Sequence, residues 1–338
     1  MQTATTIGTS MKILGALLCI ALAAVTGDTS AKAQTVPPNW PTRPIRLIVP
    51  TGPGLGTDIM ARLLADGVSR TLGQQIYVEN VPGASGITGA QQAARAAPDG
   101  YTLFFANAST FTSNMFLLKS LPYDPTRDFT AVAMVSNQGP VVVSVYPELP
   151  VKTLPELIDY GKAQPGKLSY AVDATSGLGV VVGRLLNKRG GIGMVEVPYR
   201  TTAQMMQDTS VGTTQVMISS FAAVEGFARA GKVRRIALSS ARRFPGLDDL
   251  PTIAETLPGF ELDGWLVVVA PAGTPADIVT QLNRYIGQFL RHPDIQQRLA
   301  VLGLAISGTD TAETTAQFIR QQQASWRSLA QELDLRPE

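Results

Sequence analysis

The residues of this chain that could carry out catalytic chemistry are few. The only histidine, His292, lies between two predicted helices, and the only cysteine, Cys19, lies in an N-terminal apolar run. This inventory excludes multi-histidine zinc sites and Cys–His dyads. Gly83-Ala-Ser-Gly86 lacks the second spacer of a G-x-S-x-G nucleophile elbow, and Asp173 has no paired acid near it in sequence. The residues therefore favour binding over catalysis, and we expect neither an enzyme nor a bound metal or cofactor.

A glycine-rich loop at residues 52–56 lies between an apolar run and a helical pattern. The run at residues 47–49 predicts a buried strand, and apolar residues recur at helical spacing from Ile59. Free amides and the positive end of a helix dipole converge in such a loop, which suits an anion. Thr57 replaces the third glycine of a dinucleotide fingerprint, and no lysine follows Gly56 as in a Walker loop. A carboxylate held by backbone amides and a tight turn without a ligand both remain open.

Residues 1–33 have the pattern of an export signal. A lysine precedes the apolar run of residues 13–25, and Ala31-Lys-Ala33 is a small-x-small cleavage site before Gln34. The run is too short to remain as a membrane span, and Cys19 lacks the small preceding residue of a lipoprotein signal. Two of the 28 basic residues and one of the 26 acidic residues lie in this segment. The remaining chain is close to neutral, which gives no support to nucleic-acid binding.

Short apolar strands alternate with helical patterns in two sets along the chain. Strands are predicted at residues 47–49, 76–80, 101–106, 132–135, 141–145, 168–172, 195–199, 216–218, 235–239 and 265–270. Helices are predicted from residue 59, around 91–94, and at 154–162, 179–188, 203–208, 221–230, 278–290, 295–302 and 315–333. This alternation predicts parallel sheets covered on both faces, with a binding edge at the carboxyl ends of the strands. Residues 107–114 and 244–258 are predicted to be loops.

Two α/β lobes joined by two crossings are therefore expected. Residues 34–139 and 262–338 would form the first lobe, and residues 140–261 the second. The crossings, near residues 137–140 and 263–265, would act as the hinge that closes the lobes around a ligand.

Several short motifs occur in the order known from one protein family. They include Pro44-Ile-Arg-Leu-Ile-Val-Pro50, Val78-Glu-Asn80, Pro82-Gly-Ala84, Pro98-Asp-Gly-Tyr-Thr-Leu103, Leu121-Pro-Tyr-Asp124, Val197-Pro-Tyr199 and Ala270-Pro-Ala-Gly-Thr-Pro275. Across essentially the whole mature chain, these motifs resemble the Bug-type receptors, the solute-binding proteins of tripartite tricarboxylate transporters. The resemblance implies a two-lobed periplasmic-binding-protein fold of the Venus-flytrap, type II-like kind, and a periplasmic location. It also implies capture of a small organic carboxylate, a di-, tri- or aromatic one, for delivery to a membrane permease. We expect the protein to be a monomer.

The chain departs from the family pattern mainly in the loops expected to bind. Thr51 stands where the family usually has an aromatic residue, and Leu55 where it has a second glycine. Val180 replaces a common histidine, and Ser219 a common aspartate. Because a buried ammonium needs an acid or several oxygen acceptors, a site of backbone donors, hydroxyls and Arg200 suits a di- or aromatic carboxylate better than a zwitterion.

The ligand is expected to meet loops that follow strands in both lobes. These loops carry mostly small, polar or glycine residues, whose amides can face a ligand. The candidate ligand-binding residues are Thr51, Gly52, Pro53, Gly54, Thr57, Asp58, Asn107, Ser109 and Thr110 in the first lobe, and Ala174, Thr175, Ser176, Tyr199, Arg200, Thr201, Ser219 and Phe221 in the second. Some could serve only to cap helices, which we expect for Asp58. Two other functions stay open: a sensory carboxylate-binding protein that signals to a membrane kinase, and a hydrolase or isomerase on the same scaffold.

Overall fold

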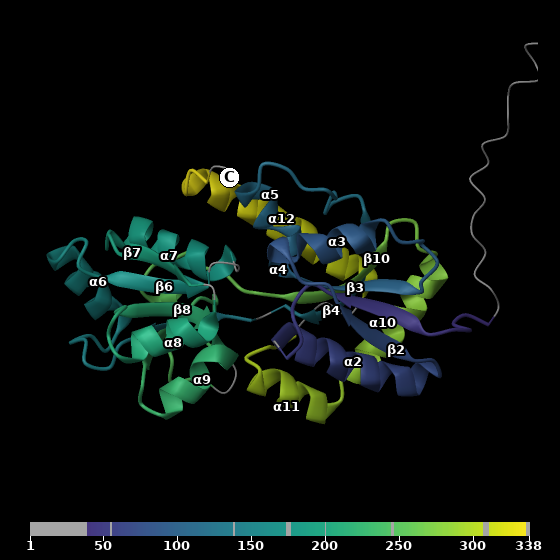
Figure 1. The fold of residues 1–338 in the computed structure, drawn as a ribbon, viewed down its shortest axis with the longest axis horizontal. Coiled ribbons are helices and arrows are strands. Elements are labelled where there is room, and N and C mark those ends of the chain that lie inside the picture. Colours follow the sequence, from purple (N-terminus) through teal and green to yellow (C-terminus); the bar gives the residue numbers. More distant parts are fainter. Residues whose placement is uncertain are drawn as a thin grey trace, which may run out of the picture. The chain divides into compact units, whose positions relative to one another are not determined.

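The chain folds into two five-stranded sheets with helices on both faces (Figure 1). The computed structural model describes residues 39–54, 56–137, 139–173, 177–199, 201–244, 247–306 and 311–335, so the expected export signal lies outside the described residues. The first sheet contains, in spatial order, β2 (Ile76–Asn80), β1 (Ile45–Val49), β3 (Thr102–Asn107), β10 (Leu266–Pro271) and β4 (Phe129–Ser136). The second contains β7 (Val195–Tyr199), β6 (Ser169–Asp173), β8 (Val216–Ser220), β5 (Val141–Val145) and β9 (Arg234–Leu238). Each sheet with its helices is called a lobe below, the first and the second.

The sheets are mixed rather than parallel. β1 pairs in parallel with β2 and β3, but β10 runs antiparallel to β3 and β4. In the second lobe, β6 is parallel to β7 and β8, but β5 runs antiparallel to β8 and β9. The expectation of parallel sheets is therefore wrong for β10 and β5. Each of these strands arrives from the other lobe, enters at the carboxyl edge of the parallel strands, and so must run the opposite way.

Helices cover the sheets much as their apolar spacing predicts. The first lobe has α2 (Gly56–Leu72), α3 (Ile87–Ala94), α4 (Ala108–Phe111), α5 (Asn114–Leu117), α10 (Ala276–Leu290) and α11 (Pro293–Val301), with a 3-10 turn η1 (Ala84–Gly86). The second has α6 (Leu154–Ala163), α7 (Gly177–Gly190), α8 (Thr202–Ser210) and α9 (Phe221–Arg229), with a 3-10 turn η2 (Ile253–Glu255). The chain ends in α12 (Ala312–Glu332). Of the helices in the described part of the chain, none is long and apolar enough to cross a membrane.

Two regions expected to be loops contain short helical turns. The loop predicted at 107–114 holds α4 because the side chain of Asn107 accepts a hydrogen bond from the Thr110 amide and caps the turn. The loop predicted at 244–258 holds η2 because Thr252 and Glu255 form a capping box. Both turns depend on a single local cap, which the overall composition of the segment does not reveal.

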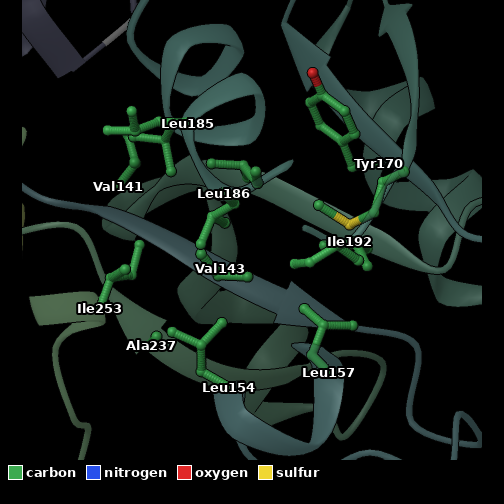
Figure 2. Close-up of a cluster of buried hydrophobic side chains, with 14 of the residues drawn as sticks. Val141, Val143, Leu154, Leu157, Tyr170, Leu185, Leu186, Ile192, Ala237 and Ile253 are labelled. Atoms are coloured by element: carbon green, nitrogen blue, oxygen red, sulfur yellow. The ribbon is translucent and has the colours of Figure 1, made fainter. Parts of the chain in front are cut away.

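Each sheet separates two hydrophobic clusters. In β1, Leu47 and Val49 pack in one cluster with α2, whereas Ile48 packs on the opposite face with Ala90 of α3. Such two-sided burial explains the unbroken apolar run of this strand. In the second lobe, Val143 of β5 packs against α6 and α7 (Figure 2). Its neighbour Val142 belongs to the cluster formed with α8 and α9.

The two crossings touch one another. The amide of Gly264 donates to the carbonyl oxygen of Gly139 at 2.9 Å, and Pro140 forms an isolated antiparallel bridge with Asp263. A Cβ atom on either glycine would lie 3.0 Å from the carbonyl oxygen of the other, so this approach favours glycine. The chain thus passes between the lobes along two adjacent extended segments. The exact lobe boundaries, 139/140 and 261/262, stay a prediction.

Candidate functional site

The candidate loops lie at the carboxyl ends of parallel strands in each lobe. Thr51 follows β1 and Asn107 ends β3, so both lie at one edge of the first sheet. Tyr199 and Ser219 lie at the ends of β7 and β8, at one edge of the second sheet. These are the edges at which parallel strands of open α/β sheets place their ligands.

The crossings connect these two edges directly. Asn107 is paired with Leu266 at the start of β10, and Ser220 is paired with Val141 at the start of β5. Each of these starts is two residues from the Gly139–Gly264 contact. Four residue steps of extended chain correspond to about 13 Å along the crossing. The strand pairings therefore place the loop after β3 and the loop after β8 at opposite ends of this stretch of crossing. The distance between them is comparable to the length of a small molecule.

The loop after β1 is held by a closed network around Asp58. One carboxylate oxygen of Asp58 accepts from the Gly54 amide at 2.8 Å and from Arg62 Nε at 3.0 Å. The other oxygen accepts from Asn80 Nδ2 at 2.8 Å, and this nitrogen also donates to the Thr51 carbonyl at 2.9 Å. Arg62 closes the ring by donating to Asn80 Oδ1 at 2.8 Å. The network ties together the ends of two strands, the loop and the first turns of α2.

Asp58 therefore holds the loop instead of capping the helix in the usual way. It is 2% exposed. Burial alone would raise the pKa of Asp58, but the hydrogen bonds from Arg62, Gly54 and Asn80 outweigh it and bring the pKa below its ordinary value. The carboxylate is thus ionised and already satisfied. Asn80 and Arg62 were not among the candidate residues, although Asn80 ends a strand and Arg62 follows Asp58 by one helical turn.

The network also changes the role expected for Gly54. Its amide donates to Asp58 and is not free for a ligand. Gly54 has φ +81°, and no atom lies within 4 Å of the place that a Cβ would take. A β-branched residue there would strain the backbone rather than simply fill space, so such a substitution could not report on ligand binding alone.

The carbonyl of Thr51 is engaged by Asn80, but the backbone amides of Thr51 and Gly52 and the Thr51 hydroxyl have no partner among the described residues. No described residue accepts a hydrogen bond from either backbone amide. The hydroxyl oxygen of Thr51 is buried and has no hydrogen-bond partner in the described part of the chain. Leaving a buried polar group unpaired costs about 1–3 kcal/mol. Three polar groups without a partner among the described residues thus lie on Thr51 and Gly52, in the loop between β1 and α2.

The loop after β3 uses its side chains to hold its own turn. Asn107 Oδ1 accepts from Ser109 Oγ at 2.8 Å and from the Thr110 amide at 3.3 Å. The hydroxyl of Thr110 donates to the Asn107 carbonyl at 2.7 Å, and Tyr123 donates to the Thr110 carbonyl at 2.8 Å. These contacts fix the loop conformation, so Asn107, Ser109 and Thr110 determine the shape of the loop at this edge of the first sheet.

In the second lobe, two candidates are engaged by α8. The Tyr199 hydroxyl donates to the Asp208 carboxylate at 2.8 Å. Burial raises the pKa of Tyr199, and the Asp208 carboxylate raises it further. The Thr201 hydroxyl caps α8 by accepting from the Gln204 amide at 3.4 Å. Ser219 is half-buried at the end of β8. Four candidates lie outside the described residues: Ala174, Thr175, Ser176 and Arg200.

Phe221 lies where the second lobe meets a segment that follows α11. It is 7% exposed, and a Cβ atom on Gly303 would lie 2.7 Å from the Phe221 Cβ. Gly303 has φ +69°, which favours glycine independently of this contact. Two residues on, the Ala305 carbonyl accepts from the Asn137 amide at 3.1 Å, in the first crossing. Phe221 therefore contributes to packing between the lobes.

The architecture and motif order match one family over most of the chain. The family model described as Tripartite tricarboxylate transporter family receptor matches residues 60–335. The chain belongs to this receptor family. The receptor is 33% identical to protein BugT of Bordetella pertussis over 317 residues, which cover 92% of this chain and 97% of BugT. It is also 33% identical to a UPF0065 protein of Bordetella bronchiseptica over 308 residues, 91% of this chain and 90% of that protein.

Solved structures of similar proteins have the same two-lobed periplasmic-binding-protein fold. Rpa4515 of R. palustris with adipate is similar with a TM-score of 0.81 and 33% identity, and the match covers 89% of this chain and 100% of that chain. MatC from Rhodopseudomonas palustris with bound malate has a TM-score of 0.74 and 31% identity, covering 86% and 99% of the two chains. The fold class expected from the sequence is thereby confirmed.

The remaining ionisable residues of the receptor assemble no metal site in the described ranges. No group of three or more histidine, cysteine, aspartate or glutamate side chains lies close enough there to hold a metal ion. His292 precedes α11, its side chain is 62% exposed, and its Nδ1 lies 3.8 Å from an Asp294 oxygen. His292 thus lies at a solvated helix end, between two helices as the sequence predicts.

Proposed function

We propose that the mature receptor is a periplasmic monomer that captures a small organic carboxylate between its lobes and delivers it to the permease of a tripartite transporter. The family supports the receptor role, and two similar structures contain the dicarboxylates adipate and malate. The observation that carries the proposal is the set of polar groups on Thr51 and Gly52, in the loop before α2, that no described residue pairs. The amides and the hydroxyl can donate to a carboxylate, which the helix dipole also favours. The export-signal pattern supports the location.

The charge distribution of the site supports a carboxylate without an ammonium group. Asp58 is the acidic residue among the first-lobe candidates, and its hydrogen bonds from Arg62, Gly54 and Asn80 leave it engaged. Ser219, in the second lobe, supplies only a hydroxyl. Among the described side chains of these loops, a buried ammonium would lack a free acidic partner, whereas carboxylate oxygens would find donors. Asp173, which ends β6, is the residue that would pair with an ammonium instead.

A thermal-shift screen of residues 34–338 tests the proposed ligand class. Adipate and malate should raise the melting temperature, because a ligand that binds only the folded state adds about 2.7 kcal/mol at one hundred times its Kd. Aspartate and 2-aminoadipate are the matched controls, since they introduce an ammonium while keeping the two carboxylates. A larger shift with the amino acids, or none with any di- or aromatic carboxylate, would contradict the proposal.

The Thr51 hydroxyl should contribute to affinity. Thr51→Val keeps the side-chain shape but removes the hydroxyl, so the Kd of the best carboxylate in the screen should rise about tenfold. Thr51→Ser keeps the hydroxyl and should bind within about threefold of the parent. Calorimetric titration measures both. Equal affinities for the parent and the valine variant would show that this hydroxyl does not meet the ligand.

A further inference from the structure

The C-terminal helix α12 packs against the cores of both lobes. In the N-terminal half of α12, Ile319 belongs to a hydrophobic cluster of the first lobe. The ring of Phe318 lies edge-on to that of Trp265, with ring centroids 5.8 Å apart. Near its C-terminal end, Trp326 and Leu329 belong to the second-lobe cluster that includes β5 and α7. Figure 1 shows this helix in yellow, running from the first lobe to the second. One rigid element is therefore anchored on both sides of the crossings.

The middle of α12 is attached to the edge of the candidate site. Gln323 is 8% exposed, and its Nε2 donates to the carbonyl of Phe111 at 3.2 Å. Phe111 is the last residue of α4, the turn that begins directly after Asn107. The buried side chain of Gln323, halfway along α12, thus attaches the helix to α4, the first-lobe turn beside the candidate site.

The last turn of α12 is fastened to α7 of the second lobe by an ion pair. Arg189 Nε and Nη2 each donate to a separate carboxylate oxygen of Glu332 at 2.8 Å. Arg189 Nη1 also donates to the Gly259 carbonyl at 2.9 Å, and Lys188 Nζ contacts the Glu332 carbonyl. The Arg189 and Glu332 side chains are only 28% and 32% exposed. Two-point geometry and partial burial make this pair stronger than a typical surface salt bridge.

We propose that α12 is a strap between the lobes and that the Arg189–Glu332 ion pair is its latch. A hinge movement at the two crossings changes the distance between the first-lobe and second-lobe attachments of α12. Because the helix cannot stretch, such a movement must loosen one attachment. The Arg189–Glu332 contact is the most exposed of the second-lobe attachments, since Trp326 and Leu329 beside it are buried. The latch therefore helps to determine the fraction of receptor molecules in which the lobes are separated, both with and without a ligand.

Distance measurements between spin labels on the two lobes test the latch. Cys19 is the only cysteine and lies outside residues 34–338, so cysteines introduced at Tyr77 and Val211 are the only labelling sites. Tyr77 on β2 and Val211 after α8 are 42% and 59% exposed, one in each lobe. Arg189→Ala should raise the ratio of long to short interlobe distances about threefold in the ligand-free protein, as expected for losing a partly buried pair.

A second bidentate pair provides the matched control. Arg243 binds Glu255 at 2.9 and 2.8 Å, with both residues in the second lobe. Arg243→Ala should leave the interlobe distances unchanged. The exchanged pair Arg189→Glu with Glu332→Arg should restore the parent distribution, which separates loss of the latch from misfolding. Equal distributions in the Arg189→Ala and Arg243→Ala proteins, or an exchanged pair that restores nothing, would overturn the proposal.

Discussion

Replacing Asp58 with alanine is expected to abolish carboxylate binding and to lower the free energy of unfolding by about 3 kcal/mol. The carboxylate is buried and accepts hydrogen bonds from Gly54, Arg62 and Asn80. Its loss leaves these donors without their acceptor and frees the loop whose Thr51 and Gly52 amides are proposed to bind. Urea denaturation measures the stability change, and calorimetry with the best carboxylate of the thermal-shift screen measures binding.

Asp124 offers a control of similar chemistry away from the site. It accepts from the Thr126 amide at 2.8 Å and from Arg127 Nε at 2.6 Å in a more exposed turn. Asp124→Ala should cost less stability and should bind normally. Normal binding by the folded Asp58→Ala protein would show that the network does not position the site.

Replacing Asp263 with asparagine is expected to stabilise the receptor at alkaline pH. Burial raises the pKa of Asp263 to about 7. The negative charge of Glu261 adds to this rise, whereas the hydrogen bond from the Gly139 amide reduces it. The folded protein therefore keeps a proton that the unfolded chain releases near pH 4, so Asp263 lowers stability increasingly as the pH rises from about 4 to about 7. The difference in the free energy of unfolding between Asp263→Asn and the parent should therefore grow, in favour of the variant, by about 4 kcal/mol between about pH 4 and about pH 8.

Urea denaturation at several pH values measures this difference. Glu261→Gln serves as a partial control, because it removes the neighbouring charge and should lower the pKa of Asp263 while leaving its burial intact. It should therefore stabilise the protein near neutral pH by less than Asp263→Asn. Parallel pH profiles for the parent and the asparagine variant would mean that Asp263 is not held protonated in the crossing.

Much of the fold follows from local patterns in the sequence. The strand, glycine loop and helix at the N-terminal end of the first lobe appear as β1 and α2, and the apolar strand at 265–270 returns to the first sheet as β10. The antiparallel direction of β10 and β5 could not be predicted in this way. A strand that is buried on both faces has the same apolar run whichever direction it takes in the sheet. Only the route of the chain between the lobes determines the direction of β10 and β5.

The site was harder to predict because its contacts join residues distant in sequence. Asp58 and Asn80 meet because β1 pairs with β2 in a register that places Val49 beside Asn80. Phe221, a candidate ligand contact, also packs against Gly303, which lies far along the chain. Sequence patterns locate the loops at the strand ends, whereas the register decides which of their groups remain unpaired.

The loop after β1 can be tested most directly by nuclear magnetic resonance on 15N-labelled residues 34–338. Titration with the carboxylate that gives the largest thermal shift should move the amide resonances of Thr51 and Gly52 saturably. The amides of Gly166 and Gly191, in turns next to α6 and α7, serve as references and should move much less. A carboxylate that saturates the receptor while leaving the Thr51 and Gly52 amides unchanged would contradict the proposed binding site.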